Sequence, residues 1–189
     1  MDTRPFMSET TRLVTADELQ KLAGDDCRYE LVAGRLIRMS PVGYQHGKIV
    51  LRFAALLDRY LEGRDLGAAV IEVGFKLALN PDTVRAPDVA FIRQDRIPPV
   101  DPKGFWQGPP DLAVEVLSPE DRPSETREKV EEYLLRGVRL VLVVDPDSKS
   151  VVVYRRLSPP VALRAGDDLL EFEDIVPGFR CRVRDIVGG

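Results

Sequence analysis

Three charged residues stand out in this sequence because each lies in or beside an otherwise apolar segment. Asp88 follows a proline at the start of an apolar run, Glu115 lies between Val114 and Val116, and Lys129 lies in the amphipathic segment that comes next. A charge in a buried strand is costly unless it is paired or bound to a cation. Two acids and a lysine brought together are the components of a metal-dependent site that cleaves phosphodiesters.

The elements that must position these residues follow from hydrophobic patterning. Residues 84–92 and 68–79 are each predicted to form one strand, and residues 112–117 form a central strand whose near-continuous apolar character indicates burial on both faces. Residues 124–136 form a helix with an apolar inner face, and residues 140–144 form a further buried strand.

The remaining patterns complete the expected fold. Thr15 and Glu18 form a capping box that opens a short helix to about residue 23, residues 29–39 form a hairpin about Gly34, and residues 45–62 form a long amphipathic helix. Short strands are expected at 151–155, 171–172 and 179–183. The fold class is α/β with a mixed β-sheet flanked by helices and with N-terminal and C-terminal β-hairpin additions. We divide the chain into an N-terminal arm and short helix, 1–27, and one domain, 28–189.

Composition narrows the class of protein. The chain has 189 residues, 44% of them hydrophobic and 31% charged, which is typical of one soluble globular domain. No apolar run is long enough to span a membrane, and no signal peptide is evident, so we expect a cytoplasmic protein. Cys27 and Cys181 are expected to be free thiols. The formal net charge of −4 argues against a general nucleic-acid coat, although it does not exclude a nuclease whose acids bind a cation.

Four spaced stretches resemble one known family. They are YELVAGRLIRMSP with His46 after it, RAPDVAFI, PDLAVEVLSP, and EKVEEYLLRGVRLVLVVDP followed by VVVYR. Their order resembles the PD-(D/E)XK, or restriction-endonuclease-like, nucleases and within these the Uma family. The resemblance covers roughly residues 28–180 and implies a restriction-endonuclease-like core.

The resemblance implies a metal site. Asp88, Glu115 and the main-chain carbonyl of Val116 would bind a divalent cation, Mg²⁺ or Mn²⁺. The superfamily places lysine two residues after the acid, but that position is Leu117 here. Lys129 on the following helix would replace it, as in the Uma family.

Three further residues are possible accessories. Glu125, one helical turn before Lys129, would orient the lysine or add to the metal site. Glu30 would be an extra acid from the N-terminal hairpin, and His46 a group at the start of the long helix. The implied function is Mg²⁺-dependent hydrolysis of DNA by an activated water molecule, in a homodimer and without a membrane partner.

Other interpretations stay open. Glu115 could be a structural partner of Arg85 or Arg139, Lys129 and Glu125 could form an ordinary surface ion pair, and Asp88 could be a turn residue. The missing lysine and the negative net charge also fit a catalytically silent nuclease-fold protein with a binding or regulatory role. A third alternative is hydrolysis of a small phosphate ester.

Overall fold

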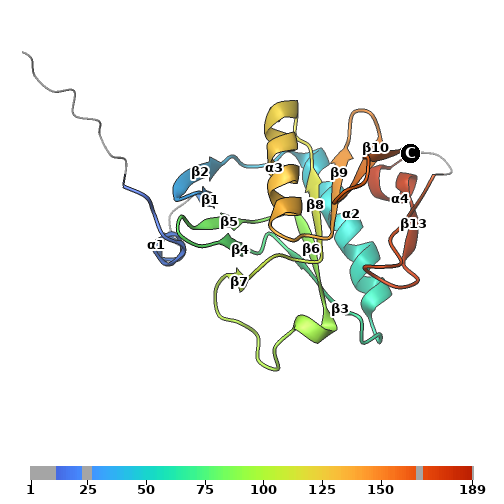
Figure 1. Ribbon diagram of the computed structural model, residues 1–189. Coiled ribbons are helices and arrows are strands. Elements are labelled where there is room, and N and C mark those ends of the chain that lie inside the picture. Colours follow the sequence, from blue (N-terminus) through green and yellow to red (C-terminus); the bar gives the residue numbers. More distant parts are fainter. Residues whose placement is uncertain (1–11, 23–26, 165–167, 189) are drawn as a thin grey trace, which may run out of the picture.

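The computed structural model describes residues 12–22, 27–164 and 168–188, and its centre is a mixed six-stranded sheet with the order β11-β10-β9-β8-β6-β3 (Figure 1). β8 (Leu112–Val116) lies inside this sheet, parallel to β9 (Leu140–Asp145) and antiparallel to β6 (Val89–Arg93). The outer strands, all antiparallel to their neighbours, are β3 (Gly67–Ile71), β10 (Ser150–Arg155) and β11 (Val161–Arg164). The expected α/β class with a mixed sheet is confirmed.

A second sheet, of five strands, has the order β2-β1-β5-β4-β7. Its members are β1 (Arg28–Val32), β2 (Arg35–Met39), β4 (Phe75–Ala78), β5 (Thr83–Arg85) and β7 (Trp106–Gln107). The expected N-terminal hairpin is β1 and β2, which pair antiparallel across a turn containing Ala33 and Gly34. Both turn residues have positive φ, 47° and 76°, a conformation that glycine adopts without steric cost.

The two long helices cover opposite faces of the six-stranded sheet (Figure 1). Ile49, Phe53 and Leu57 of α2 (Tyr44–Leu61) pack on the face formed by alternate strand residues such as Val114. The C-terminal residues, including α4 (Val183–Val187), join this core. On the other face, Val130 and Tyr133 of α3 (Pro123–Leu135) pack in a second core with residues of the five-stranded sheet such as Phe75.

Two predicted strands are each divided between the two sheets, which corrects the prediction. Residues 68–79 form β3 in the first sheet and β4 in the second, with Glu72 at φ 53° between them. Residues 84–92 contain the end of β5 and most of β6, and Pro87 and Asp88 lie in the break. The chain changes sheets here, so Asp88 precedes its strand instead of lying inside it.

The ends of the chain add smaller elements. α1 (Ala16–Lys21) has the predicted capping box of Thr15 and Glu18, and it packs on the second sheet. The short 3₁₀-helix η1 (Gln94–Arg96) follows β6. β12 (Leu169–Glu171) pairs with β13 (Arg180–Arg182), close to the predicted positions.

The prediction missed η1, β7, β11 and α4, because two to five residues are too few to show a clear period. Residues 1–11 of the expected arm, and residues 23–26 where its helix was expected to end, lie outside the described residues. The two cysteines are free, as expected. Within the described ranges no helix has the length and apolar character needed to cross a membrane.

Candidate active site

Strand register places Asp88 and Glu115 beside each other. Val89 of β6 pairs with Val114 of β8, so the residue before β6 lies next to the residue after Val114 in the neighbouring strand. Within β8, Val114 and Val116 belong to the core beneath α2, so Glu115 points to the opposite face, which α3 covers. The α3 side chains of Lys129 and Tyr133 therefore meet Glu115 there.

Asp88 is held by contacts on both of its oxygens. Its Oδ2 accepts a 2.7 Å hydrogen bond from the main-chain N–H of Val116, and its Oδ1 lies 3.1 Å from Nε2 of His46. Nδ1 of His46 lies 3.2 Å from Oγ of Ser118. His46 is buried in the first turn of α2, and its two nitrogens connect that helix to the residue before β6 and to the segment that follows β8. The histidine thus fixes the direction of the Asp88 carboxylate.

Glu115 and Lys129 form a direct ion pair. Nζ of Lys129 lies 2.9 Å from Oε2 of Glu115, and the hydroxyl of Tyr133 donates a 2.7 Å hydrogen bond to Oε1. The side chains of Lys129 and Glu115 are only 18% and 13% exposed, so water screens this pair weakly. Leu117, at the position where the superfamily has its lysine, packs against the second core.

Glu30 extends this ion pair into a network. Its Oε1 lies 3.3 Å from Nζ of Lys129 and accepts a 2.9 Å hydrogen bond from the N–H of Ala86. Its Oε2 accepts a 2.8 Å hydrogen bond from Arg85, which also donates to Glu132 of α3 at 2.7 Å. Acidic and basic side chains therefore alternate along the network, in the order Glu132, Arg85, Glu30, Lys129 and Glu115.

Burial and neighbouring charges set the ionisation of this network. Burial, together with the charges of Asp88 and Glu30, raises the pKa of Glu115 to about 7, although Lys129 opposes the shift. Burial lowers the pKa of Lys129, but Glu115 and Glu30 more than offset this and raise it above its usual value, so the amine stays charged. Burial raises the pKa of Glu30, but the charges of Lys129 and Arg85 outweigh it and hold the pKa low.

The pKa of His46 is raised, which favours an imidazolium beside Asp88. Burial opposes the charged ring, but the hydrogen bond and the negative charge of Asp88 outweigh it. Burial, and then Glu115, raises the pKa of Tyr133 well above its usual value, so this hydroxyl remains a donor. Both residues therefore support the ionised form of a carboxylate.

Five of the six candidate side chains meet in this network, and Glu125 does not. Glu125 lies on the exposed start of α3, where it pairs with Arg122 at 3.6 Å and its side chain is 64% exposed. The ammonium of Lys129 contacts Glu115 and Glu30 instead. The expectation that Glu125 orients the lysine is therefore wrong, because the buried acids lie on the inner side of the helix.

The geometry also decides between the structural interpretations. Arg85 pairs with Glu30 and Glu132, and Arg139 pairs with Asp174, so the described contacts of Glu115 are to neither arginine. Asp88 accepts a hydrogen bond from a strand 28 residues away, which a local turn residue would not do.

Sequence reasoning assigned no polar role to Tyr133 or Ser118. A signal for Tyr133 existed, since it lies one helical turn after Lys129 on the inner face of the same helix.

A cleft of about 1240 Å³ opens over the network and reaches from the N-terminal hairpin to α3. Acidic residues outnumber Lys and Arg along its walls: the acids are Glu30, Glu72, Asp88, Glu115, Glu120, Asp121, Glu125 and Glu128, and the bases are Arg28, Arg38, Arg85 and Lys129. A cleft with this balance repels an anionic substrate unless cations bind in it.

The donor set fits a hard divalent cation held partly by water. Across the described residues, no three or more His, Cys, Asp or Glu side chains are arranged as a metal cluster. Mg²⁺, however, is commonly bound by one or two carboxylates together with waters and substrate phosphates. Asp88 and Glu115 each offer about four lone-pair positions, and the described contacts use two on each.

Comparisons with known proteins identify the fold and the family. A crystal structure of a "putative nuclease belonging to DUF820" from Anabaena variabilis ATCC 29413 matches with a TM-score of 0.81, covering 92% of this chain and 97% of that one. Its sequence identity is 20%, so the match establishes a common fold. Comparison with curated proteins found no significant match. A family model described as "Uma2: Putative restriction endonuclease" matches residues 16–184, and the chain therefore belongs to the Uma2 family of restriction-endonuclease-like proteins.

Proposed function

We propose that this protein is a Mg²⁺-dependent endonuclease that hydrolyses DNA phosphodiester bonds with an activated water molecule. The observation that carries the proposal is the 2.9 Å contact between Lys129 and Glu115, beside Asp88. Through this contact, α3 provides a lysine in place of the one that the superfamily has at the position of Leu117. The family description and the fold support the same class of activity.

Oxygens of Asp88 and Glu115, together with the carbonyl of Val116, would hold the cation. Bound there, Mg²⁺ would polarise the phosphate and lower the pKa of a water ligand. Its positive charge would also reverse the repulsion expected from the acidic cleft. Mn²⁺, which also accepts oxygen ligands, is expected to substitute for it.

Lys129 would act as a fixed cation and not as a base, because its partners keep the amine protonated. Its charge favours the ionised form of Glu115 and lies where it can stabilise negative charge developing on the phosphate. Glu30 and Arg85 would position the ammonium, and His46 would position the Asp88 carboxylate. The proton that leaves the attacking water is therefore expected to pass to solvent or to a phosphate oxygen.

The proposal is tested by cleavage of supercoiled plasmid and of single-stranded DNA with Mg²⁺, Mn²⁺ or EDTA. The wild type is expected to cut with either metal and not in EDTA. Asp88→Asn and Lys129→Met are each expected to lower the cleavage rate at least about a hundredfold. Losses of this size follow the removal of single groups that stabilise charge in the transition state. Asp95→Asn and Lys103→Met change exposed residues of the same types outside the cleft and serve as controls. Cutting in EDTA, or unchanged cutting by Asp88→Asn, would refute the metal mechanism.

A homodimer is part of the proposal, because cutting both strands of a duplex needs two sites or two encounters with one. Size-exclusion chromatography with light scattering measures the mass directly against the 21.2 kDa of one chain. A dimer should convert plasmid directly to the linear form. A monomer should accumulate the nicked form first.

A catalytically silent binding protein is the second candidate. The observation favouring it is that both carboxylates already have protein partners on each oxygen. In that case the cleavage assay gives no product under any condition, and Mg²⁺ does not raise the unfolding temperature. A small phosphodiester cleaved without any cleavage of DNA would instead indicate a small-molecule hydrolase.

A further inference from the structure

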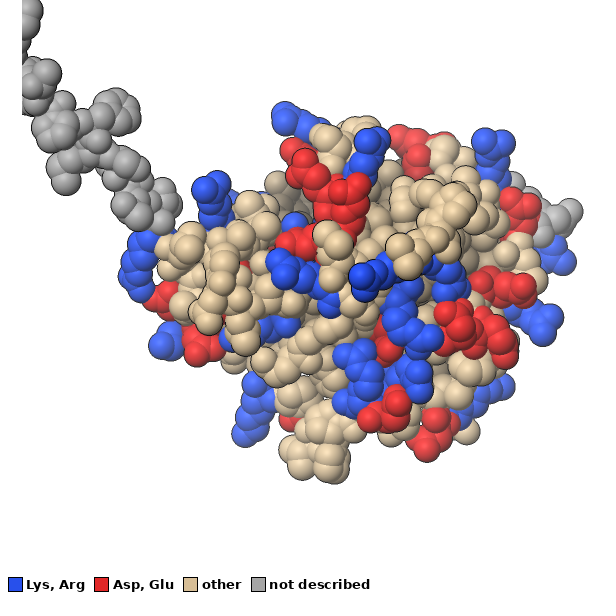
Figure 2. Space-filling view, in the orientation of Figure 1, with Lys and Arg blue, Asp and Glu red and all other residues tan. Residues whose placement is uncertain are grey.

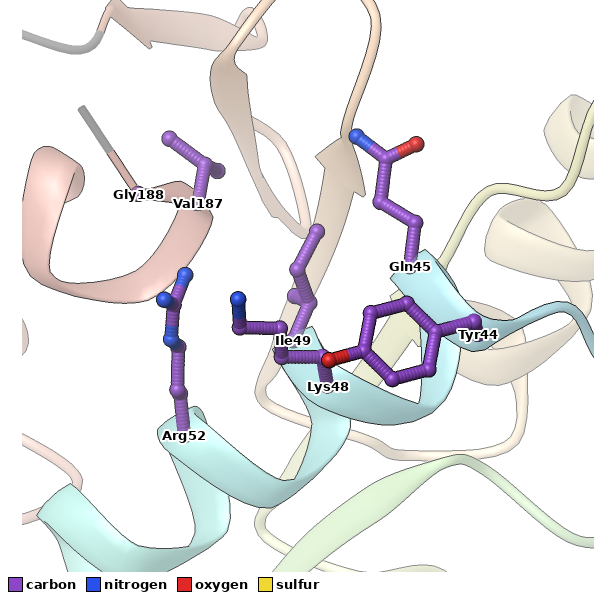
Figure 3. A pocket seen from close by; sticks show the side chains of 7 residues that line it. All are labelled: Tyr44, Gln45, Lys48, Ile49, Arg52, Val187 and Gly188. Atoms are coloured by element: carbon purple, nitrogen blue, oxygen red, sulfur yellow. The ribbon is translucent and has the colours of Figure 1, made fainter.

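A second hollow, of about 270 Å³, lies on the far side of α2 from the acidic network. It is lined by Tyr44, Lys48 and Arg52 of the helix, and by Val187 and Gly188 near the C-terminus. The three helix residues are spaced four apart and therefore lie on one face. His46 lies two positions from Tyr44 and from Lys48 and faces the cleft instead. Figure 3 shows Lys48 and Arg52 rising from α2 on the side of Val187 and Gly188.

The hollow differs from the cleft in charge. Its lining contains two cations and no acid, and within the described part of the chain neither Lys48 nor Arg52 has a carboxylate within ion-pair distance. The guanidinium of Arg52 lies close to Gly188: a Cβ atom built on that glycine would be 2.7 Å from one of the guanidinium nitrogens. Elsewhere on the molecule, Lys and Arg are interspersed with Asp and Glu over the face shown in Figure 2. Unpaired cations around a concave surface are suited to bind an anion.

An aromatic ring stands at the edge of the same hollow. Tyr44 is 85% exposed, and Nζ of Lys48 lies 5.9 Å from its ring centroid. A ring so exposed contributes little to the stability of the fold. Aromatic side chains beside basic groups are the platforms on which proteins stack the bases of unpaired strands.

The hollow and the cleft meet around the first turn of α2. Gly43 and His46 line the cleft, and Tyr44 and Gln45 line the hollow. A strand leaving the acidic network must cross about the 10 Å width of the helix to reach the hollow, a distance that a few nucleotides of unpaired strand can span.

We infer that this hollow binds a nucleotide of an unpaired DNA strand, with its phosphate on Lys48 and Arg52 and its base on Tyr44, a few nucleotides from the bond that is cut. The position of this nucleotide relative to the cut bond rests on the proposed nuclease function. It explains how an acidic protein with an acidic cleft holds a polyanion: the affinity comes from outside the cleft. It also predicts that DNA with a single-stranded segment beside the cut bond binds more tightly than fully paired DNA.

The test is binding of a fluorescent single-stranded oligonucleotide in EDTA, with Asp88→Asn as the parent to prevent cleavage. Adding Lys48→Ala and Arg52→Ala is expected to weaken binding about tenfold or more and to lower the slope of log affinity against log salt by about 0.7, because the two cations together neutralise one phosphate. Tyr44→Ala is expected to weaken binding roughly fivefold or more at all salt concentrations and to leave the slope unchanged. Lys103→Ala with Arg156→Ala removes the same charges from exposed positions outside the hollow and should change neither quantity.

Arg52 is half-buried, so Lys48→Glu at an exposed position provides a variant that leaves the core intact. It should weaken binding of the single strand at an unchanged unfolding temperature. Equal losses for the control pair, or no loss for Lys48→Glu, would overturn the inference. Equal effects of Tyr44→Ala on single-stranded and fully paired DNA would also overturn it.

Failure of this inference and failure of the proposed function are distinguishable. If plasmid is cut but the hollow variants bind and cut like wild type, the nuclease proposal stands and the hollow is not used. If nothing is cut but the variants lose single-stranded binding as expected, the hollow binds nucleic acid in a protein without turnover. Cleavage of bis(p-nitrophenyl) phosphate, which cannot reach across α2, should be unchanged by Lys48→Glu in an active enzyme.

Discussion

Removing the ammonium of Lys129 should destabilise the folded protein by an amount that depends on pH. The change is Lys129→Met, which keeps much of the side-chain volume and removes the charge. The lysine contacts Glu115 at 2.9 Å and Glu30 at 3.3 Å, and its side chain is 18% exposed. Its loss leaves two carboxylates without their common cation, although Glu30 keeps Arg85.

The magnitude follows from burial and from the pKa of Glu115. Breaking a buried ion pair by removing one partner costs about 3–5 kcal/mol, because the other charge stays buried. The pKa of Glu115 is raised from 4.5 to about 7 while Lys129 opposes the shift, so without the lysine it must rise further. The protonated carboxyl stabilises the fold fully below pH 4.5, and this contribution is lost as the pH rises through the folded pKa.

The variant should therefore lose less stability at acidic pH than at alkaline pH. Near pH 6 Glu115 is largely protonated in both proteins. Above about pH 7 the Glu115 carboxyl of the wild type ionises beside the Lys129 ammonium, which the variant lacks. The difference in unfolding free energy between the two proteins should therefore grow by up to about 1.4 kcal/mol per pH unit. We expect a loss of about 3 kcal/mol at pH 8.5 and at least about 1 kcal/mol less at pH 6.5.

Urea unfolding in EDTA at several pH values measures this difference. Lys103→Met is the control, since Lys103 is exposed outside the cleft. Adding Glu115→Gln to Lys129→Met should remove most of the pH dependence. A loss below about 0.5 kcal/mol, as for an exposed pair, or a loss equal at every pH, would show that Lys129 and Glu115 do not form a buried ion pair.

Three further predictions concern the same site. Mg²⁺ binding measured by calorimetry should strengthen up to about tenfold per pH unit below about pH 7, because the cation must displace the proton of Glu115, and should level off above it; a flat profile would contradict the assignment. Tyr133→Phe should lower the unfolding free energy by about 1.5–3 kcal/mol, the value of a hydrogen bond to a charged group, while Tyr154→Phe, whose hydroxyl has no such acceptor among the described contacts, should cost far less. His46→Gln should lower the cleavage rate at saturating Mg²⁺ less than Asp88→Asn does, and rates that fall equally would show that the histidine does more than position the aspartate.

The acids and the lysine were predictable because each signal was local. Glu115 interrupts an apolar strand, Asp88 begins an earlier apolar run, and Lys129 lies on the inner side of its helix. Family resemblance then supplied the reason to combine them. Glu125 was misplaced by the same local logic: a spacing of four residues gives a shared face, but only the tertiary structure shows where the acids lie on it.

The partners of these residues were not predictable in the same way. Arg85 reaches Glu30 across 55 positions and Glu132 across 47, and strand pairing alone decides such contacts. The division of residues 84–92 between two sheets is also tertiary, since each half contributes buried apolar residues such as Val84 and Val89. Pro87 was the available signal, because proline is rare inside a paired strand.

The proposed metal site is tested most directly by anomalous diffraction from a crystal grown with Mn²⁺. If Asp88 and Glu115 hold the cation, one anomalous peak lies in the cleft, bound directly to an oxygen of each, and Asp88→Asn shows no such peak. A Mn²⁺ ion bound only elsewhere, or a cleft in which Lys129 alone neutralises both carboxylates at saturating Mn²⁺, would contradict this assignment.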